Sequence, residues 1–107
     1  MTMMTLQKTS CFVINLPRDV ERRARMEAVL NDLRLEFAIV DAVIGSKLRP
    51  DQLEFFEHLA EMKLRPAEYG CMMSHIGCWR TFLASDADRA LVCEDDIHVA
   101  PHIKECL

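Results

Sequence analysis

Three short apolar runs, separated by longer stretches, most constrain what this chain can fold into. They are "CFVINL" (11–16), "FAIVDAV" (37–43) and "ALVC" (90–93), and runs of this length and composition are typical of buried strands. Between the first two, "PRDVERRARMEAVLNDL" (17–33) has apolar residues at helical spacing and a proline near its start. A strand, a helix and a strand with short connections predict a right-handed parallel βαβ unit. The chain is therefore expected to form an α/β fold with a mainly parallel sheet flanked by helices.

Two further helices are predicted between the second and third runs, over residues 49–63 and 66–85. In the second helix, larger side chains recur at helical spacing, which predicts that their face packs into the core. These residues are Met72, His75, Ile76, Trp79, Phe82 and Leu83. Neither repeats nor linkers interrupt the sequence, so we expect an N-terminal tail (1–10) and a single domain (11–107).

The overall charge argues against a general attraction to nucleic acid, because 17 acidic residues outnumber 13 basic ones among the 107. No apolar stretch approaches the roughly 20 residues that span a bilayer, and the start lacks the features of a secretory signal. We therefore expect a cytoplasmic protein. The five cysteines are odd in number and outside Cys-x-x-Cys spacing, which favours reduced, mostly buried thiols.

Three consecutive acidic residues, Glu94, Asp95 and Asp96, directly follow the third strand. Ligands of open α/β sheets bind outside the carboxyl ends of the strands. Clustered carboxylates repel one another, and a bound divalent cation removes that cost. Oxygen ligands select Mg²⁺ or Mn²⁺. The alternative is that the triplet only ends a strand and solvates a loop.

The predicted helix 66–85 also carries Cys71, His75 and Cys78, whose i, i+4, i+7 spacing could hold zinc. Because no fourth ligand is spaced nearby, the interpretation as core residues is favoured. His98 could join a metal site beside Asp96, although an ordinary surface histidine is the favoured interpretation.

Four segments, in order, resemble glycosyltransferase family 25, the lipopolysaccharide biosynthesis type. They are "VINLPRDVERRARM" (13–26), "IVDAVIG" (39–45), "EYGCMMSHIGCWR" (68–80) and "ALVCEDDIHV" (90–99). The resemblance implies a Rossmann-like GT-A fold that binds a nucleotide sugar. It also implies transfer of a sugar, such as galactose from UDP-galactose, to a glycan or lipooligosaccharide acceptor with the help of Mn²⁺ or Mg²⁺.

The same resemblance implies roles for individual residues. Glu94 and Asp96 would hold the metal on the diphosphate side, with Asp95 in support. The donor would be bound by residues at the strand ends and on the middle helix, namely Asn15, Arg18, Asp41, Ser74 and His75. Arg22 and Arg23 also follow the first strand, but an exposed, solvated helix face is the favoured explanation for each of them.

Complete GT-A enzymes are considerably longer than this chain, which ends at Leu107, shortly after the acidic triplet. We therefore expect a truncated donor-binding half whose catalytic base lies elsewhere. The alternative is an inactive α/β binding or assembly module derived from that family. Either form is compatible with a homodimer that covers the face left bare, and with peripheral attachment to the inner membrane.

Overall fold

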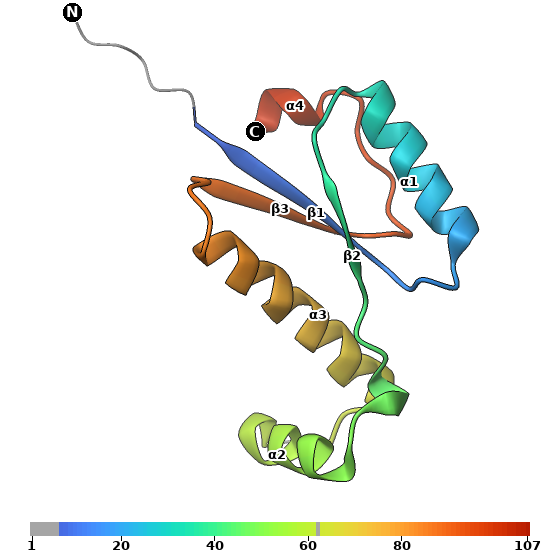
Figure 1. Cartoon of the computed structure of the whole chain (residues 1–107), viewed down its shortest axis with the longest axis vertical. Coiled ribbons are helices and arrows are strands. Elements are labelled where there is room, and N and C mark those ends of the chain that lie inside the picture. The colour runs from blue at the N-terminus through green and yellow to red at the C-terminus, as the bar shows by residue number, and fades with distance from the viewer. Residues whose placement is uncertain (1–6, 62) are drawn as a thin grey trace, which may run out of the picture.

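The computed structural model describes residues 7–61 and 63–107, and in it a parallel sheet lies between helices on both faces (Figure 1). This arrangement confirms the predicted α/β class. In chain order the elements are β1 (Thr9–Asn15), α1 (Val20–Asp32), β2 (Ala38–Asp41), a short 3-10 helix (Gly45–Lys47), α2 (Pro50–Ala60), α3 (Pro66–Leu83), β3 (Arg89–Glu94) and α4 (Ile103–Cys106).

The sheet has the order β2-β1-β3, and both pairs of strands are parallel. The chain leaves β1 through α1 to reach β2 on one side. It then returns through α2 and α3 to β3 on the other side. The connection that leaves β1 and the connection that enters β3 therefore run to opposite sides of the boundary between these two strands. Open α/β sheets bind ligands at such a switch point.

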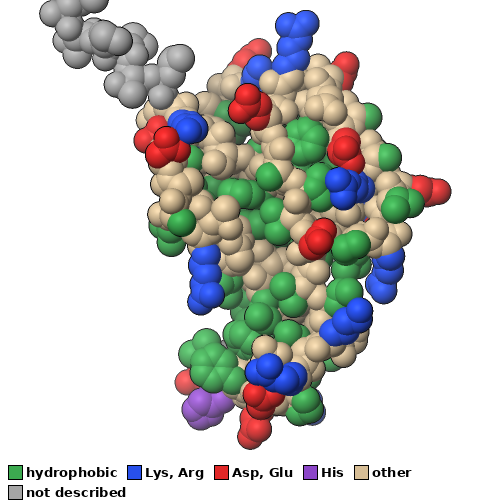
Figure 2. Space-filling view, in the orientation of Figure 1, with side chains coloured by type: hydrophobic (Ala, Val, Ile, Leu, Met, Phe, Trp, Pro, Cys, Tyr) green, Lys and Arg blue, Asp and Glu red, His purple; other side chains and the backbone are tan. Residues whose placement is uncertain are grey.

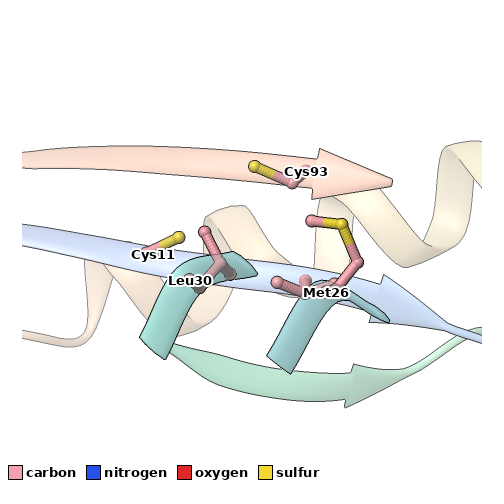
Figure 3. Close-up of a cluster of buried hydrophobic side chains, with 5 residues drawn as sticks. Cys11, Met26, Leu30 and Cys93 are labelled. Atoms are coloured by element: carbon pink, nitrogen blue, oxygen red, sulfur yellow. The ribbon is translucent and has the colours of Figure 1, made fainter. Parts of the chain in front are cut away.

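One face of β1 packs against α1. Cys11 and Val13 point to this face, and Met26 and Leu30 of α1 reach down to them, together with Cys93 of β3 (Figure 3). Val13, Met26 and Leu30 are completely buried. The sequence alternation of β1 sends Phe12 and Ile14 to the opposite face, where they meet Cys78 of α3.

The prediction that the larger side chains of α3 pack into the core is wrong for Trp79 and Leu83. The helix instead buries Tyr69, Gly70, Ser74 and Cys78, whereas Trp79 is 53% exposed and Leu83 is 78% exposed. Of the predicted face, Phe82 does pack against the cluster of Phe12, Ile14 and Cys78. Small residues at every fourth position, Gly70, Ser74 and Cys78, let the helix approach its neighbours closely. Among the described residues, Tyr69 is the one large side chain of the helix that is fully buried.

Two glycines show how close this approach is. A Cβ on Gly70 would lie 2.6 Å from the backbone oxygen of Val43, and a Cβ on Gly45 would lie 1.6 Å from that of Pro66. A real Cβ does not fit at either distance. Glycine is therefore required on both sides of the contact between α3 and the loop after β2.

The predicted elements occur in the predicted order, with shifted boundaries. The helix expected from residue 17 begins at Val20, because the chain first turns at Asp19, whose N–H donates to the Leu16 carbonyl. β1 begins at Thr9, inside the predicted tail. Residues 1–6 of that tail lie outside the described part. The final helix, α4, was not predicted.

Figure 2 shows exposed hydrophobic side chains toward the α2 end of the molecule. Phe55 and Leu59 of α2 are 61% and 68% exposed. Among the described residues, no helix combines the length and apolar character needed to cross a bilayer.

Candidate functional site

A cleft of about 310 Å³ lies at the carboxyl ends of the strands, at the switch point of the sheet. Its walls come from the turn after β1, the loop after β2, the first turns of α3 and the acidic triplet after β3. The lining residues include Arg18, Arg22, Gly45, Ser46, Cys71, Ser74, Glu94, Asp95 and Asp96. Segments distant in sequence therefore form one site.

Asp95 is the buried member of the acidic triplet, at 8% exposure. Its Oδ2 accepts a hydrogen bond of 2.8 Å from Nδ2 of Asn15, and its Oδ1 lies 3.5 Å from Nη1 of Arg22. Burying a carboxylate is costly unless it is hydrogen-bonded and paired. Asp95 therefore joins the ends of β1 and β3, while Glu94 and Asp96 on either side are exposed.

Asn15 is 1% exposed, and its side-chain nitrogen makes two hydrogen bonds, the first of which is the bond to Asp95. Its Nδ2 also donates to the carbonyl of Asp19, at 3.2 Å, which fixes the turn between β1 and α1. Within the described part of the chain, its Oδ1 is buried without a hydrogen-bond partner. The amide thus positions the site from beneath, and it does not line the cleft.

The arginines of α1 and of the turn before it have different tasks. Arg25 donates from Nη2 to the carbonyls of Asp95, at 3.0 Å, and Ile97, at 2.7 Å, and so anchors the loop after β3. Arg18 and Arg22 line the cleft, whereas Arg23 pairs with Glu27 along the exposed helix face. The cleft therefore presents guanidinium groups together with exposed carboxylates.

Glu94 contacts the second turn of α3. Sγ of Cys71 donates to its Oε1 at 3.1 Å, and Nε2 of His75 lies 3.9 Å from the same oxygen. The hydrogen bond to Glu94 is the main reason that the pKa of Cys71 is raised, followed by burial and by the negative charges of Glu94 and Asp96. The thiol is therefore held protonated in this arrangement.

Ser74 closes the floor of the cleft. Its Oγ donates to the Gly70 carbonyl, at 2.7 Å, and accepts from the N–H of Val43, at 2.8 Å. The hydroxyl thus clamps α3 to the loop after β2. Asp41 pairs in register with Asn15 at the end of β2, but it is exposed and outside the lining of the cleft.

Most of the predicted site residues are therefore brought to one place. Arg18, Ser74 and the acidic triplet line the cleft, Asn15 supports it, and His75 lies beside Glu94. The zinc set of Cys71, His75 and Cys78 is not brought together, because Cys78 faces the sheet.

Sequence reasoning missed the structural role of Arg25, which no local pattern distinguishes from the other arginines of α1. It also missed the contact between Cys71 and Glu94. That contact depends on how α3 packs against β3, which the sequence of either element alone does not show.

Comparison with known proteins adds an independent line of information. The model of glycosyltransferase family 25 (LPS biosynthesis protein) matches residues 8–107. The chain is 31% identical over 105 residues to procollagen galactosyltransferase 2 of Homo sapiens, covering 90% of this chain and 17% of that protein. It is 30% identical over 102 residues to a glycosyltransferase 25 family member of Aedes aegypti, covering 87% of this chain and 17% of that protein.

A third relative is named as inactive. The chain is 30% identical over 105 residues to inactive glycosyltransferase 25 family member 3 of Mus musculus, covering 90% of this chain and 18% of that protein. The chain thus spans less than a fifth of the length of each of these relatives.

Proposed function

Because the chain belongs to glycosyltransferase family 25, we propose that its cleft binds the donor of a sugar transfer, a nucleoside diphosphate sugar. The observation that carries the proposal is the meeting of Arg18 and Arg22 with the exposed carboxylates Glu94 and Asp96 in one cleft. A diphosphate needs positive charge, and a divalent cation that bridges it needs oxygen ligands.

The donor atoms available fit Mn²⁺ or Mg²⁺, since Glu94 and Asp96 both offer exposed carboxylate oxygens beside the cleft. When bound, such a cation would neutralise the charge that develops on the leaving nucleoside diphosphate. Glu94 and Asp96 would hold it. Asp95 would act indirectly, because its carboxylate is already occupied by Asn15 and is near Arg22.

The remaining residues of the site would bind and orient the donor. Arg18 and Arg22 would contact phosphate oxygens, and Ser74 would keep the loop after β2 in place against the donor. We propose galactose as the sugar, since two similar proteins are named procollagen galactosyltransferase 2. The family description favours an acceptor of the lipopolysaccharide type. The cytoplasmic location, the homodimer and the membrane attachment stay predictions.

Calorimetric titration of the 107-residue chain with UDP-galactose, with and without Mn²⁺, tests this proposal. We expect saturable binding that needs Mn²⁺ and that weakens at least about tenfold in Asp96→Asn, because one charged ligand is lost. Asp51→Asn on α2 is the matched control, since it removes an exposed carboxylate that does not line the cleft. Absence of binding, or equal binding by Asp96→Asn, would refute the donor site.

A second candidate function is donor binding without catalysis, as a binding or assembly module. It is favoured by the 30% identity to a relative that is named as inactive. The two candidates separate in an assay of UDP-galactose hydrolysis and of transfer to a glycan acceptor. Turnover that is lost in Asp96→Asn supports the enzyme, whereas binding without turnover supports the module.

A further inference from the structure

A second group of ligating atoms lies at the rim of the same cleft and differs in chemistry from the carboxylates. Sγ of Cys71, a ring nitrogen of His75 and a carboxylate oxygen of Glu94 all lie within 4.8 Å of one another. From this geometry we infer that Cys71, His75 and Glu94 bind a soft divalent cation, Zn²⁺, with a fourth position left open.

The distances are close to those that zinc requires. With ordinary bond lengths of about 2.3 Å to sulfur and about 2.0–2.1 Å to nitrogen and oxygen, tetrahedral ligands lie roughly 3.3–3.6 Å apart. Here Oε1 of Glu94 lies 3.1 Å from Sγ of Cys71 and 3.9 Å from Nε2 of His75. Small side-chain rotations therefore suffice to admit the ion.

The backbone already holds these ligands in place. Cys71 and His75 are separated by one helical turn on α3, which is the spacing that puts two zinc ligands on one helix face. Glu94 is the last residue of β3, and β3 is fixed against β1 along its whole length. Two rigid elements thus meet at the site.

Charge and access also suit a zinc ion. Zinc binding displaces the proton that Cys71 donates to Glu94. The resulting thiolate, the carboxylate and a neutral imidazole together carry two negative charges, which Zn²⁺ balances. The side chains of His75 and Glu94 are 29% and 50% exposed, and Cys71 is exposed. Water or a donor oxygen can therefore take the fourth position, as in zinc sites that are open to solvent.

The two cation sites share Glu94. On the premise of the proposed function, zinc at Cys71 and His75 would draw Glu94 away from the Mn²⁺ site and would reduce Mn²⁺-dependent binding of the nucleotide sugar. The zinc site itself does not depend on that premise, because its ligands are complete without a nucleotide.

Absorption spectroscopy with Co²⁺ tests the site in the absence of any nucleotide. Titration of the reduced chain should produce a thiolate-to-cobalt charge-transfer band, which one equivalent of Zn²⁺ removes. Cys71→Ser should abolish the band. Cys106→Ser is the matched control, since Cys106 is the other exposed cysteine, and it should leave the band unchanged. A band that persists in Cys71→Ser or disappears in Cys106→Ser overturns the inference, as does the lack of any band.

The other two ligands are tested by competition of Zn²⁺ with a coloured chelator. His75→Ala and Glu94→Gln should each weaken zinc binding by at least about tenfold, because even second-shell changes cost that much. Undiminished affinity in both variants contradicts the site.

Alkylation of the wild-type chain removes any dependence on how the variants fold. Zn²⁺ should protect Cys71 from iodoacetamide and leave Cys106 reactive, as read by peptide mass spectrometry. Equal alkylation of Cys71 with and without Zn²⁺ would overturn the inference.

Discussion

On the α1 face of the sheet, the helix contributes large aliphatic side chains to the core, whereas on the α3 face the sheet contributes Phe12 and Ile14 and the helix contributes mostly small residues. Met26 and Leu30 are completely buried beneath α1. On the other side, Gly70, Ser74 and Cys78 form the inner face of α3, and a serine hydroxyl joins it to a loop. The α1 face is thus packed by apolar side chains of both the helix and the sheet, and the α3 face fixes the position of the cleft.

The largest expected effect is on the α1 face. Leu30→Ala should lower the free energy of unfolding by about 2–5 kcal/mol, because it removes a completely buried side chain and leaves a cavity. Val20→Ala, at a position that is 66% exposed on the same helix, should change it by less than about 0.5 kcal/mol. Urea denaturation measures both. Similar losses in the two variants would contradict the burial of Leu30.

On the α3 face, adding volume should be harmful. Gly70→Ala places a Cβ at 2.6 Å from the Val43 oxygen and should cost about 1–3 kcal/mol through overpacking. Gly77→Ala, in open space on the same helix, should instead stabilise by roughly 0.5–1 kcal/mol through helix propensity. Chemical denaturation of both variants separates the cost of the close contact at Gly70 from the effect of helix propensity. A neutral Gly70→Ala would mean that α3 can move away from the loop.

The serine clamp should have a smaller effect on stability and a visible effect on the cleft. Ser74→Ala leaves the N–H of Val43 without its partner and should cost about 1–2 kcal/mol. Amide hydrogen exchange at Val43 should accelerate, since this bond protects it. Unchanged exchange at Val43 would argue that backbone packing alone holds the loop.

The smallest effect is expected on the outer face of α3. Trp79→Ala should change the free energy of unfolding by no more than about 0.5 kcal/mol, because the indole is 53% exposed. A buried tryptophan would cost about 3–5 kcal/mol. Chemical denaturation of the variant therefore distinguishes the two faces of this helix. A loss of about 3–5 kcal/mol in the free energy of unfolding would instead support the core face predicted from spacing.

The sequence predicts the element order and the site better than it predicts the packing of α3. Apolar runs identify β1, β2 and β3, but only β1 is largely buried, whereas β2 and β3 at the two edges of the sheet are mostly half-buried or exposed. Helical spacing in α3 is compatible with more than one buried face. The large hydrophobic side chains favour a face that includes Trp79 and Leu83, which are exposed in the structure. Close approach at Gly70 and Ser74 depends on a loop distant in sequence, which no periodicity within the helix reports.

Within the site, the acidic triplet is apparent from sequence, but the difference among its members is not. The sequence does not show that Asp95 is buried while Glu94 and Asp96 are exposed. It does not show that Asp95 is held by Asn15, a residue 80 positions earlier. The contact of Glu94 with Cys71 likewise depends on the docking of α3 against β3.

The central position of β1 also has a consequence for synthesis. Thr9 pairs with Arg89, 80 residues later in the chain, so at typical rates of about 5–20 residues per second this edge of β1 waits roughly 4–16 s for its partner. During that time the segment Cys11–Phe12–Val13–Ile14 presents an unpaired, apolar strand edge, the kind of surface on which nascent chains aggregate. Yield during expression should therefore depend on how long β3 takes to emerge, and on chaperones that cover β1 until it does.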